Sequence, residues 1–121
     1  MKEIQGLELY TYDEIIDLIR DFIESTLREN GYSRRDVALN DIRLHGSRLR
    51  NQAKEDSDLD AVVEYSGDIR EDDLFDMLHE DPLFIDDIEI DINPINSDET
   101  DIDEYMRNSF EYDKKKLLRS L

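Results

Sequence analysis

The sequence predicts an α+β fold of the α/β type, in which a small mixed β-sheet is flanked by helices. Apolar residues recur at three- and four-residue spacing over residues 11–30, the pattern of an amphipathic helix. Short apolar runs and two-residue alternation over 58–65 and 85–95 indicate strands instead. The elements follow the order helix, strand, turn, strand, helix, strand, helix, and a length of 121 residues suits a single domain over 1–121.

The first helix is expected over residues 11–30. Thr11 and Glu14 have the spacing of a capping box at its start, and Asn30-Gly31 supplies a left-handed stop at its end. One face of this helix is apolar, so we expect that face to meet the core. Its members are Ile15, Ile16, Leu18, Ile19, Phe22, Ile23 and Leu27.

Two strands are expected after this helix. Residues 37–45 alternate over a short range and read as the first strand, followed by a helix or helical turn over 47–54. Residues 58–65, DLDAVVEY, are rich in apolar residues and are broken by Ser66-Gly67, so they predict the second strand.

The stretch 85–95, IDDIEIDINPI, is the clearest strand, and we expect Pro94 to close it. Side chains alternate across a strand, so its apolar and polar residues point to opposite faces. The apolar face holds Ile88, Ile90 and Ile92, and the polar face holds Glu89, Asp91 and Asn93.

Two more helices complete the expected fold. One begins with a capping box of Asp68 and Glu71 and ends before Pro82. Its core face is predicted to hold Ile69, Leu74, Phe75 and Leu78. The other runs from Ser97 onward, with acids in its first turn and bases near its end, as the helix dipole favours.

Composition excludes several classes of function. The formal net charge is -18, and residues 68–113 hold 18 acidic residues against Arg70 and Arg107, which argues against a long nucleic acid as substrate. The absence of cysteine excludes disulfides and thiolate zinc sites. No apolar run could span a membrane or form a signal peptide, so we expect a soluble, cytoplasmic protein without a membrane partner.

The stretch 45–60, HGSRLRNQAKEDSDLD, concentrates the residues that suggest chemistry. Gly46 permits close approach of the backbone to a ligand, and Ser47 offers a hydroxyl and an amide to an anion such as phosphate. Basic residues that would surround a compact polyanion here are Arg43, Arg48, Arg50 and Lys54.

Two acidic residues, Asp58 and Asp60, lie two apart at the start of an apolar strand and therefore project from the same face. Like charges at that spacing repel, unless a cation lies between them. Asp91, on a strand expected to pair beside them, can add a third carboxylate. Three carboxylates around two Mg²⁺ ions suit an in-line displacement at phosphorus.

Other metal sites fit the sequence less well. An EF-hand loop starting at Asp56 would need glycine where Ala61 stands and glutamate where Gly67 stands. A zinc site has only His45 and His79 to draw on, of which we expect the first to be a packing residue and the second to be exposed. No Walker-type phosphate loop is present.

The tripeptide GSR at 46–48, followed after a short gap by SDLD at 57–60 running into a strand, resembles the signature of the DNA polymerase beta-like nucleotidyltransferase superfamily, in particular its minimal nucleotidyltransferase (MNT) branch. The similarity covers about residues 40–95. The third carboxylate is assigned to Asp91 because family members usually have an apolar-Asp-apolar strand there, although Glu89 lies on the same face.

The resemblance implies a nucleotidyltransferase fold and a Mg²⁺-dependent transfer of a nucleoside monophosphate from a nucleotide triphosphate, ATP by preference, to a hydroxyl acceptor. Asp91 would bind the catalytic metal and assist deprotonation of the acceptor. The residues that match the family's motif are Gly46, Ser47 and Arg48, for the triphosphate, and Asp58, Asp60 and Asp91, for two Mg²⁺ ions.

The resemblance also implies a partner. Minimal members of the family are commonly antitoxins paired with a HEPN-type toxin, which some of them inactivate by adding AMP to a tyrosine. The acidic stretch 68–113 would then face a basic partner. The alternative is a catalytically inert MNT-fold module that inhibits its partner by contact. Since Asp58, Asp60 and Asp91 are all present, the enzyme is the leading hypothesis.

Overall fold

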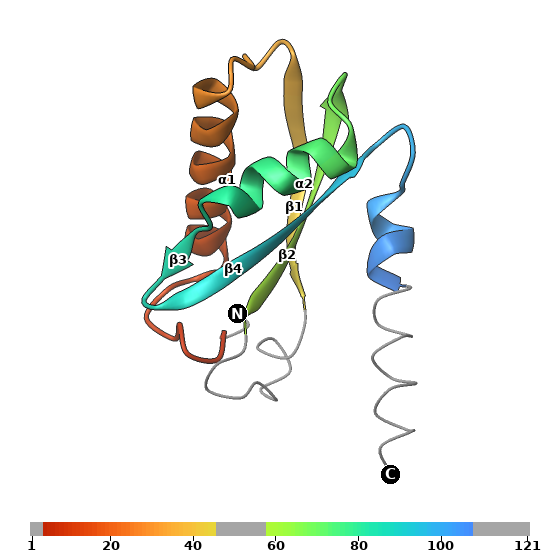
Figure 1. Cartoon of the computed structure of the whole chain (residues 1–121). Coiled ribbons are helices and arrows are strands. Elements are labelled where there is room, and N and C mark those ends of the chain that lie inside the picture. Colours follow the sequence, from red (N-terminus) through yellow and green to blue (C-terminus); the bar gives the residue numbers. More distant parts are fainter. Residues whose placement is uncertain (1–3, 46–57, 108–121) are drawn as a thin grey trace.

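The computed structural model describes residues 4–45 and 58–107 (Figure 1). Its elements are α1 (Tyr12–Glu29), β1 (Val37–His45), β2 (Leu59–Gly67), α2 (Glu71–Glu80), β3 (Phe84–Ile85) and β4 (Ile88–Asn96). A further helical segment covers residues 102–107. The expected α+β fold, a small mixed sheet flanked by helices, is confirmed.

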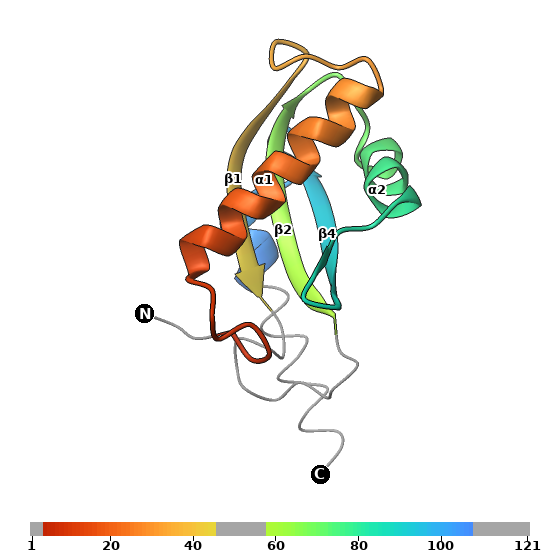
Figure 2. The ribbon, with the colours of Figure 1, turned by 90° about the vertical axis from the view of Figure 1, so that its left-hand side faces the viewer.

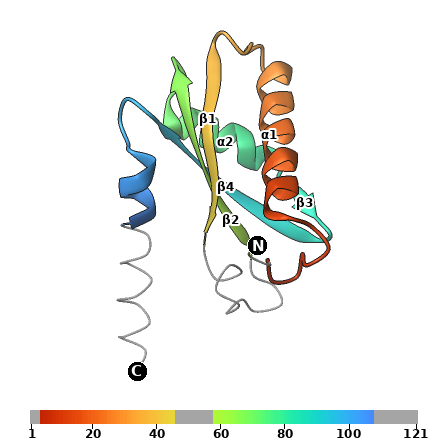
Figure 3. The same ribbon diagram turned by 180° about the vertical axis from the view of Figure 1, so that it is seen from behind.

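The four strands form one mixed sheet in the order β1-β2-β4-β3. β1 and β2 pair antiparallel, β2 and β4 pair parallel, and β3 and β4 pair antiparallel. The parallel pair requires a crossover, which α2 and β3 provide. In Figure 2, α1 lies in front of the sheet and the 102–107 helix lies behind it, and in Figure 3 α1 lies to the right of the sheet and the 102–107 helix to its left.

Helix α1 forms where its local signals predict. The Thr11 backbone N–H donates to Glu14 Oε1 at 2.9 Å, and the Glu14 N–H donates to Thr11 Oγ1 at 3.1 Å, which completes the capping box. At the other end Gly31 has φ +86°, and the Tyr32 N–H donates to the Leu27 carbonyl, as in a Schellman motif. Both ends of the helix are thus closed by local hydrogen bonds.

The main core lies between the sheet and the helices α1 and α2. From α1 it takes Ile15, Ile19, Ile23 and Leu27. From β2 it takes Leu59, Ala61, Val63 and Tyr65, all with 0% exposure. Two residues expected in the core are exposed instead: Leu18 is 41% exposed and Phe75 is 39% exposed, because each lies at the margin of its helix's apolar face.

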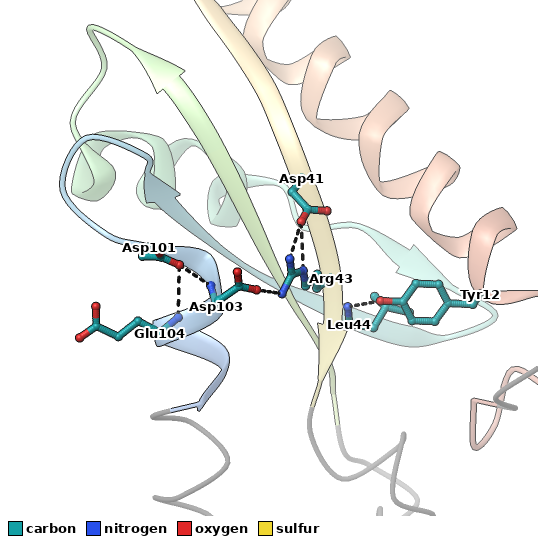
Figure 4. A network of polar contacts seen from close by, with 7 residues as sticks. All are labelled: Tyr12, Asp41, Arg43, Leu44, Asp101, Asp103 and Glu104. Atoms are coloured by element: carbon teal, nitrogen blue, oxygen red, sulfur yellow. Dashed lines mark hydrogen bonds and ion pairs between the residues drawn. The ribbon is translucent and has the colours of Figure 1, made fainter.

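A second, smaller cluster forms on the opposite face of the sheet, where Val62 and Ile95 pack with Ile102 of the last helix. This helix begins at residue 102 and not at Ser97, so the expected start was wrong. Asp101 caps it, since its Oδ1 accepts from the backbone N–H groups of Asp103 and Glu104 (Figure 4).

The capping box predicted for α2 is also wrong. The N-cap is Arg70, with no side-chain hydrogen bond at this position. Glu71 turns its carboxylate toward the end of β4 instead, where Oε2 accepts from the Asn96 backbone N–H at 2.7 Å and from Thr100 Oγ1 at 3.3 Å. The Glu71 carboxylate therefore accepts from the backbone N–H at the end of β4 and does not take part in a local capping box. The helix ends before Pro82, as expected.

The stretch predicted as one strand over 85–95 is a hairpin. Asp86 and Asp87 have φ values of 48° and 69°, the left-handed pair of a two-residue type I′ turn between β3 and β4. Pro94 does not close the strand, because β4 continues to Asn96 and Pro94 pairs in register with Val63. Proline is tolerated there because β3 pairs only with the first two residues of β4.

Candidate active site

Asp60 of β2 and Asp91 of β4 are paired residues of neighbouring parallel strands. One step earlier along the same two strands, Leu59 pairs with Ile90, both buried in the main core. Because side chains alternate across a strand, the two aspartates project from the sheet face opposite to that core. The expectation that Asp91 lies on a strand pairing beside Asp60 is therefore confirmed.

A second pair of acidic residues lies one side-chain repeat away. Asp58, directly before β2, is exposed, and its carboxyl group hydrogen-bonds with that of Glu89 on β4. Desolvation, together with the charge and hydrogen bond of Asp58, raises the pKa of Glu89 above its ordinary value, and the charge of Asp91 adds to this rise. The structure thus brings both candidates for the third carboxylate to the site, Glu89 beside Asp58 and Asp91 beside Asp60.

His79 of α2 is a partner of Asp91 that the sequence did not reveal. Its Nε2 lies 2.8 Å from Asp91 Oδ1, and its Nδ1 lies 2.7 Å from the carbonyl oxygen of Phe75. The imidazole also stacks on the Phe75 ring, with centroids 3.9 Å apart and planes at 24°. The prediction that His79 is exposed is wrong, because its side chain is 28% exposed and contacts the Asp91 carboxylate, the Phe75 carbonyl oxygen and the Phe75 ring.

The electrostatics of His79 follow from these contacts. Burial by itself would lower its pKa, but the hydrogen bonds to Asp91 and Phe75, with the charges of Asp91 and Glu89, raise the pKa above its ordinary value. The sequence places Phe75 and His79 four residues apart on one helix, which predicts that their rings lie side by side. That spacing does not predict the contact of His79 with Asp91 of β4.

On the other side of β2, His45 at the end of β1 pairs in register with Asp60. The His45 ring meets the Tyr105 ring edge to face, with centroids 6.0 Å apart, so its expected role as a packing residue is supported. Tyr105 is half-buried and accepts a hydrogen bond from Asn93 Nδ2 through its hydroxyl. Through Tyr105, the last helix therefore packs beside Asp60 and Asp91, against His45 of β1 and Asn93 of β4.

Gly46, Ser47 and Arg48, the residues predicted to hold the triphosphate, lie outside the described residues, as do Arg50 and Lys54. They follow directly on His45 in the chain, at the strand end that pairs with Asp60. The phosphate site predicted for them stays a prediction.

Arg43, one of the bases expected around a polyanion, forms ion pairs with two acidic side chains. Its guanidinium group pairs with Asp41 on the same strand at 3.0 Å and with Asp103 of the last helix (Figure 4). The hydrogen bond of Asp103 is the leading contribution that raises the pKa of Arg43. Beside this network, the Leu44 backbone N–H donates to the Tyr12 hydroxyl, which ties β1 to α1.

The donor chemistry of the site fits a hard divalent cation, because carboxylate oxygens are the ligands that Mg²⁺ prefers. Within residues 4–45 and 58–107, however, no group of three or more acidic, histidine or cysteine side chains is arranged to hold a metal ion. The adjacent pair of Asp60 and Asp91 is compatible with Mg²⁺, which commonly uses one or two protein carboxylates and completes its shell with water and substrate phosphates.

Among the described residues, no helix has the length and apolar character needed to cross a membrane. The family model of the nucleotidyltransferase domain matches residues 19–119, a region that includes Asp60 of β2 and Asp91 of β4. Searches of curated proteins and of solved structures found no match. Since the matched region is most of the chain and contains the paired aspartates, the chain belongs to the nucleotidyltransferase domain family.

Proposed function

We propose that this protein is a metal-dependent nucleotidyltransferase that moves a nucleoside monophosphate, AMP from ATP by preference, to a hydroxyl acceptor. The observation that carries the proposal is the register of Asp60 with Asp91 across the parallel strands. Membership of the nucleotidyltransferase family gives the reaction class. A metal ion bound between the two carboxylates would explain why two like charges lie side by side in a chain that is already strongly acidic.

In the proposed reaction, the acceptor oxygen forms a bond to the α-phosphorus of the nucleotide while the bond to pyrophosphate breaks, and pyrophosphate leaves. Asp91 takes the proton of the acceptor hydroxyl. Mg²⁺, when bound by Asp60 and Asp91 with Asp58, supplies charge neutralisation for the phosphate oxygens. Gly46, Ser47 and Arg48 are proposed to hold the triphosphate, as the resemblance to minimal nucleotidyltransferases implies.

We further propose a protein as acceptor, in particular a tyrosine of a HEPN-type toxin. This rests on the resemblance to the minimal branch, and the acidic surface of α2 and the β3–β4 hairpin agrees with a basic partner. Incubation of the two proteins with ATP and Mg²⁺ would be followed by intact-mass spectrometry of the partner. An added AMP mass supports the enzyme; inhibition without any mass change supports a module that acts by contact.

The nucleotide site is tested by calorimetric titration with ATP, with and without Mg²⁺, of the wild type and of Asp60→Asn. We expect Mg²⁺-dependent binding that Asp60→Asn abolishes. The matched control is Glu64→Gln, which removes one negative charge from the same face of β2, two side-chain repeats away, and should leave binding unchanged. Equal loss in both variants would mean that only net charge matters, and absence of binding in the wild type would contradict the proposal.

A further inference from the structure

We propose that His79 is a positioning residue for Asp91: it fixes the carboxylate through Oδ1 and leaves Oδ2 as the atom that turns to the metal. The inference rests on the proposed function, because it takes Asp91 to be a metal ligand. It assigns a role to a residue of α2, an element that lies between β2 and β4 in the sequence and carries neither acidic motif.

The contacts of His79 define its orientation completely. A backbone carbonyl accepts hydrogen bonds and cannot donate them, so Nδ1 must be the donor to the Phe75 oxygen at 2.7 Å. This bond and the stacking on the Phe75 ring set the plane of the imidazole. Nε2 then points at Asp91 Oδ1, at 2.8 Å. Rotating the ring away from this orientation would break at least one of the three contacts.

Asp91 needs such support more than a buried residue would. Its side chain is 45% exposed, and the neighbouring charges, Asp60 in the paired position and Glu89 two residues earlier, are of the same sign. Repulsion would turn a free carboxylate away from its neighbours and toward water. A hydrogen bond from a ring that is itself held by α2 keeps the carboxylate at the sheet, and such outer contacts of ligating groups commonly set metal affinity.

The test compares two amides at one position. In His79→Gln, the amide nitrogen reaches about the place of Nε2 and can still donate to Asp91, whereas in His79→Asn it reaches only the place of Nδ1. Both substitutions are uncharged, so any effect of a lost positive charge is the same in the two proteins. The difference between them reports the hydrogen bond to Asp91.

The readout is the affinity for Mn²⁺ alone, which takes the same oxygen ligands as Mg²⁺ and is followed by the paramagnetic resonance signal of the free ion. Affinity that Asp91→Asn removes is assigned to the site. We expect His79→Gln to bind about tenfold more tightly than His79→Asn. The matched controls are Asp76→Gln and Asp76→Asn, at an exposed position of the same helix, which should bind alike.

The outcomes separate this inference from the proposed function. If Asp91→Asn weakens Mn²⁺ binding but the two His79 variants bind equally, the positioning role is wrong and the metal site stands. If the wild type binds no better than Asp91→Asn, the metal site is wrong and the inference falls with it. Should the His79 variants not fold, Phe75→Leu replaces them: a loss of about threefold, the size of a stacking contact, supports the inference, and unchanged affinity overturns it.

Discussion

Asp60 and Asp91 lie side by side on two parallel strands, so the loss of one of their two charges would relieve the repulsion between them. We therefore expect Asp60→Asn to leave the metal-free protein as stable as the wild type or more stable by up to about 1 kcal/mol. Urea denaturation in the presence of a chelator measures this. Unfolding of the variant would show that Asp60 is a structural residue and would contradict the site assignment.

The β3–β4 turn offers a stabilising substitution. Asp87 adopts φ 69°, a conformation that costs energy for a residue with a side chain, and glycine is preferred there in type I′ turns. We expect Asp87→Gly to raise the free energy of unfolding by about 0.5 kcal/mol. Denaturant titration measures the change.

The neighbouring position is the control for that substitution. Asp86→Gly relieves a similar strain at φ 48° but removes the acceptor of the Tyr10 hydroxyl, which donates to Asp86 Oδ1 at 3.1 Å. It should therefore gain less stability than Asp87→Gly. A larger gain at Asp86 would mean that the contact with Tyr10 does not stabilise the hairpin.

Glu71 links the start of α2 to the end of β4. Replacing it with alanine leaves the Asn96 N–H and the Thr100 hydroxyl without their shared acceptor, so Glu71→Ala should destabilise the fold by about 1–3 kcal/mol. Glu71→Gln keeps an acceptor oxygen and should lose less. Asp72→Ala, at the next and exposed position of the same helical turn, is the control and should change stability by less than about 0.5 kcal/mol.

Tyr65 predicts an effect at alkaline pH. Its side chain is fully buried and its hydroxyl donates to the Ile69 carbonyl at 2.6 Å, and burial raises its pKa above the ordinary value of about 10. A group whose pKa is higher in the folded state contributes stability below its unfolded pKa, and this stability is lost as pH rises through the folded pKa. The wild type should therefore lose stability above about pH 10.

Tyr65→Phe isolates that contribution from the other tyrosines. The variant should be less stable at neutral pH by about 1–2 kcal/mol, because the Ile69 carbonyl loses its donor, and its stability should fall less steeply above pH 10. Denaturant titrations between pH 8 and about 11 compare the slopes. Parallel curves for the two proteins would show that Tyr65 does not titrate in the unfolding transition.

The sequence was most informative where hydrogen bonds are local. The Thr11–Glu14 capping box and the Gly31 stop lie within a few residues of what they cap, and both were predicted correctly. Strand β1 was also predicted with its observed bounds, and the alternation along β4 correctly placed Asp91 on the polar face. These features need no knowledge of distant elements.

The predictions were wrong where a residue distant in the sequence determines the local structure or contact. Asp68 and Glu71 have the spacing of a capping box, but the Glu71 carboxylate accepts a hydrogen bond from the backbone N–H of Asn96, 25 residues away in the chain, instead. Asp86 and Asp87 lack the glycine that marks most type I′ turns, so the hairpin was not visible. The contact of His79 depends on how α2 crosses the sheet, which no local pattern contains.

The parallel pairing of β2 with β4 also has a kinetic meaning. The chain between Asp60 and Asp91 contains α2 and the β3–β4 turn, so the two carboxylates meet only after a long loop has closed. Contacts of this kind form slowly compared with the turns of α1 and the hairpins. A refolding experiment should therefore recover helical signal before it recovers metal affinity. The interval between the two would measure how long β4 takes to pair with β2.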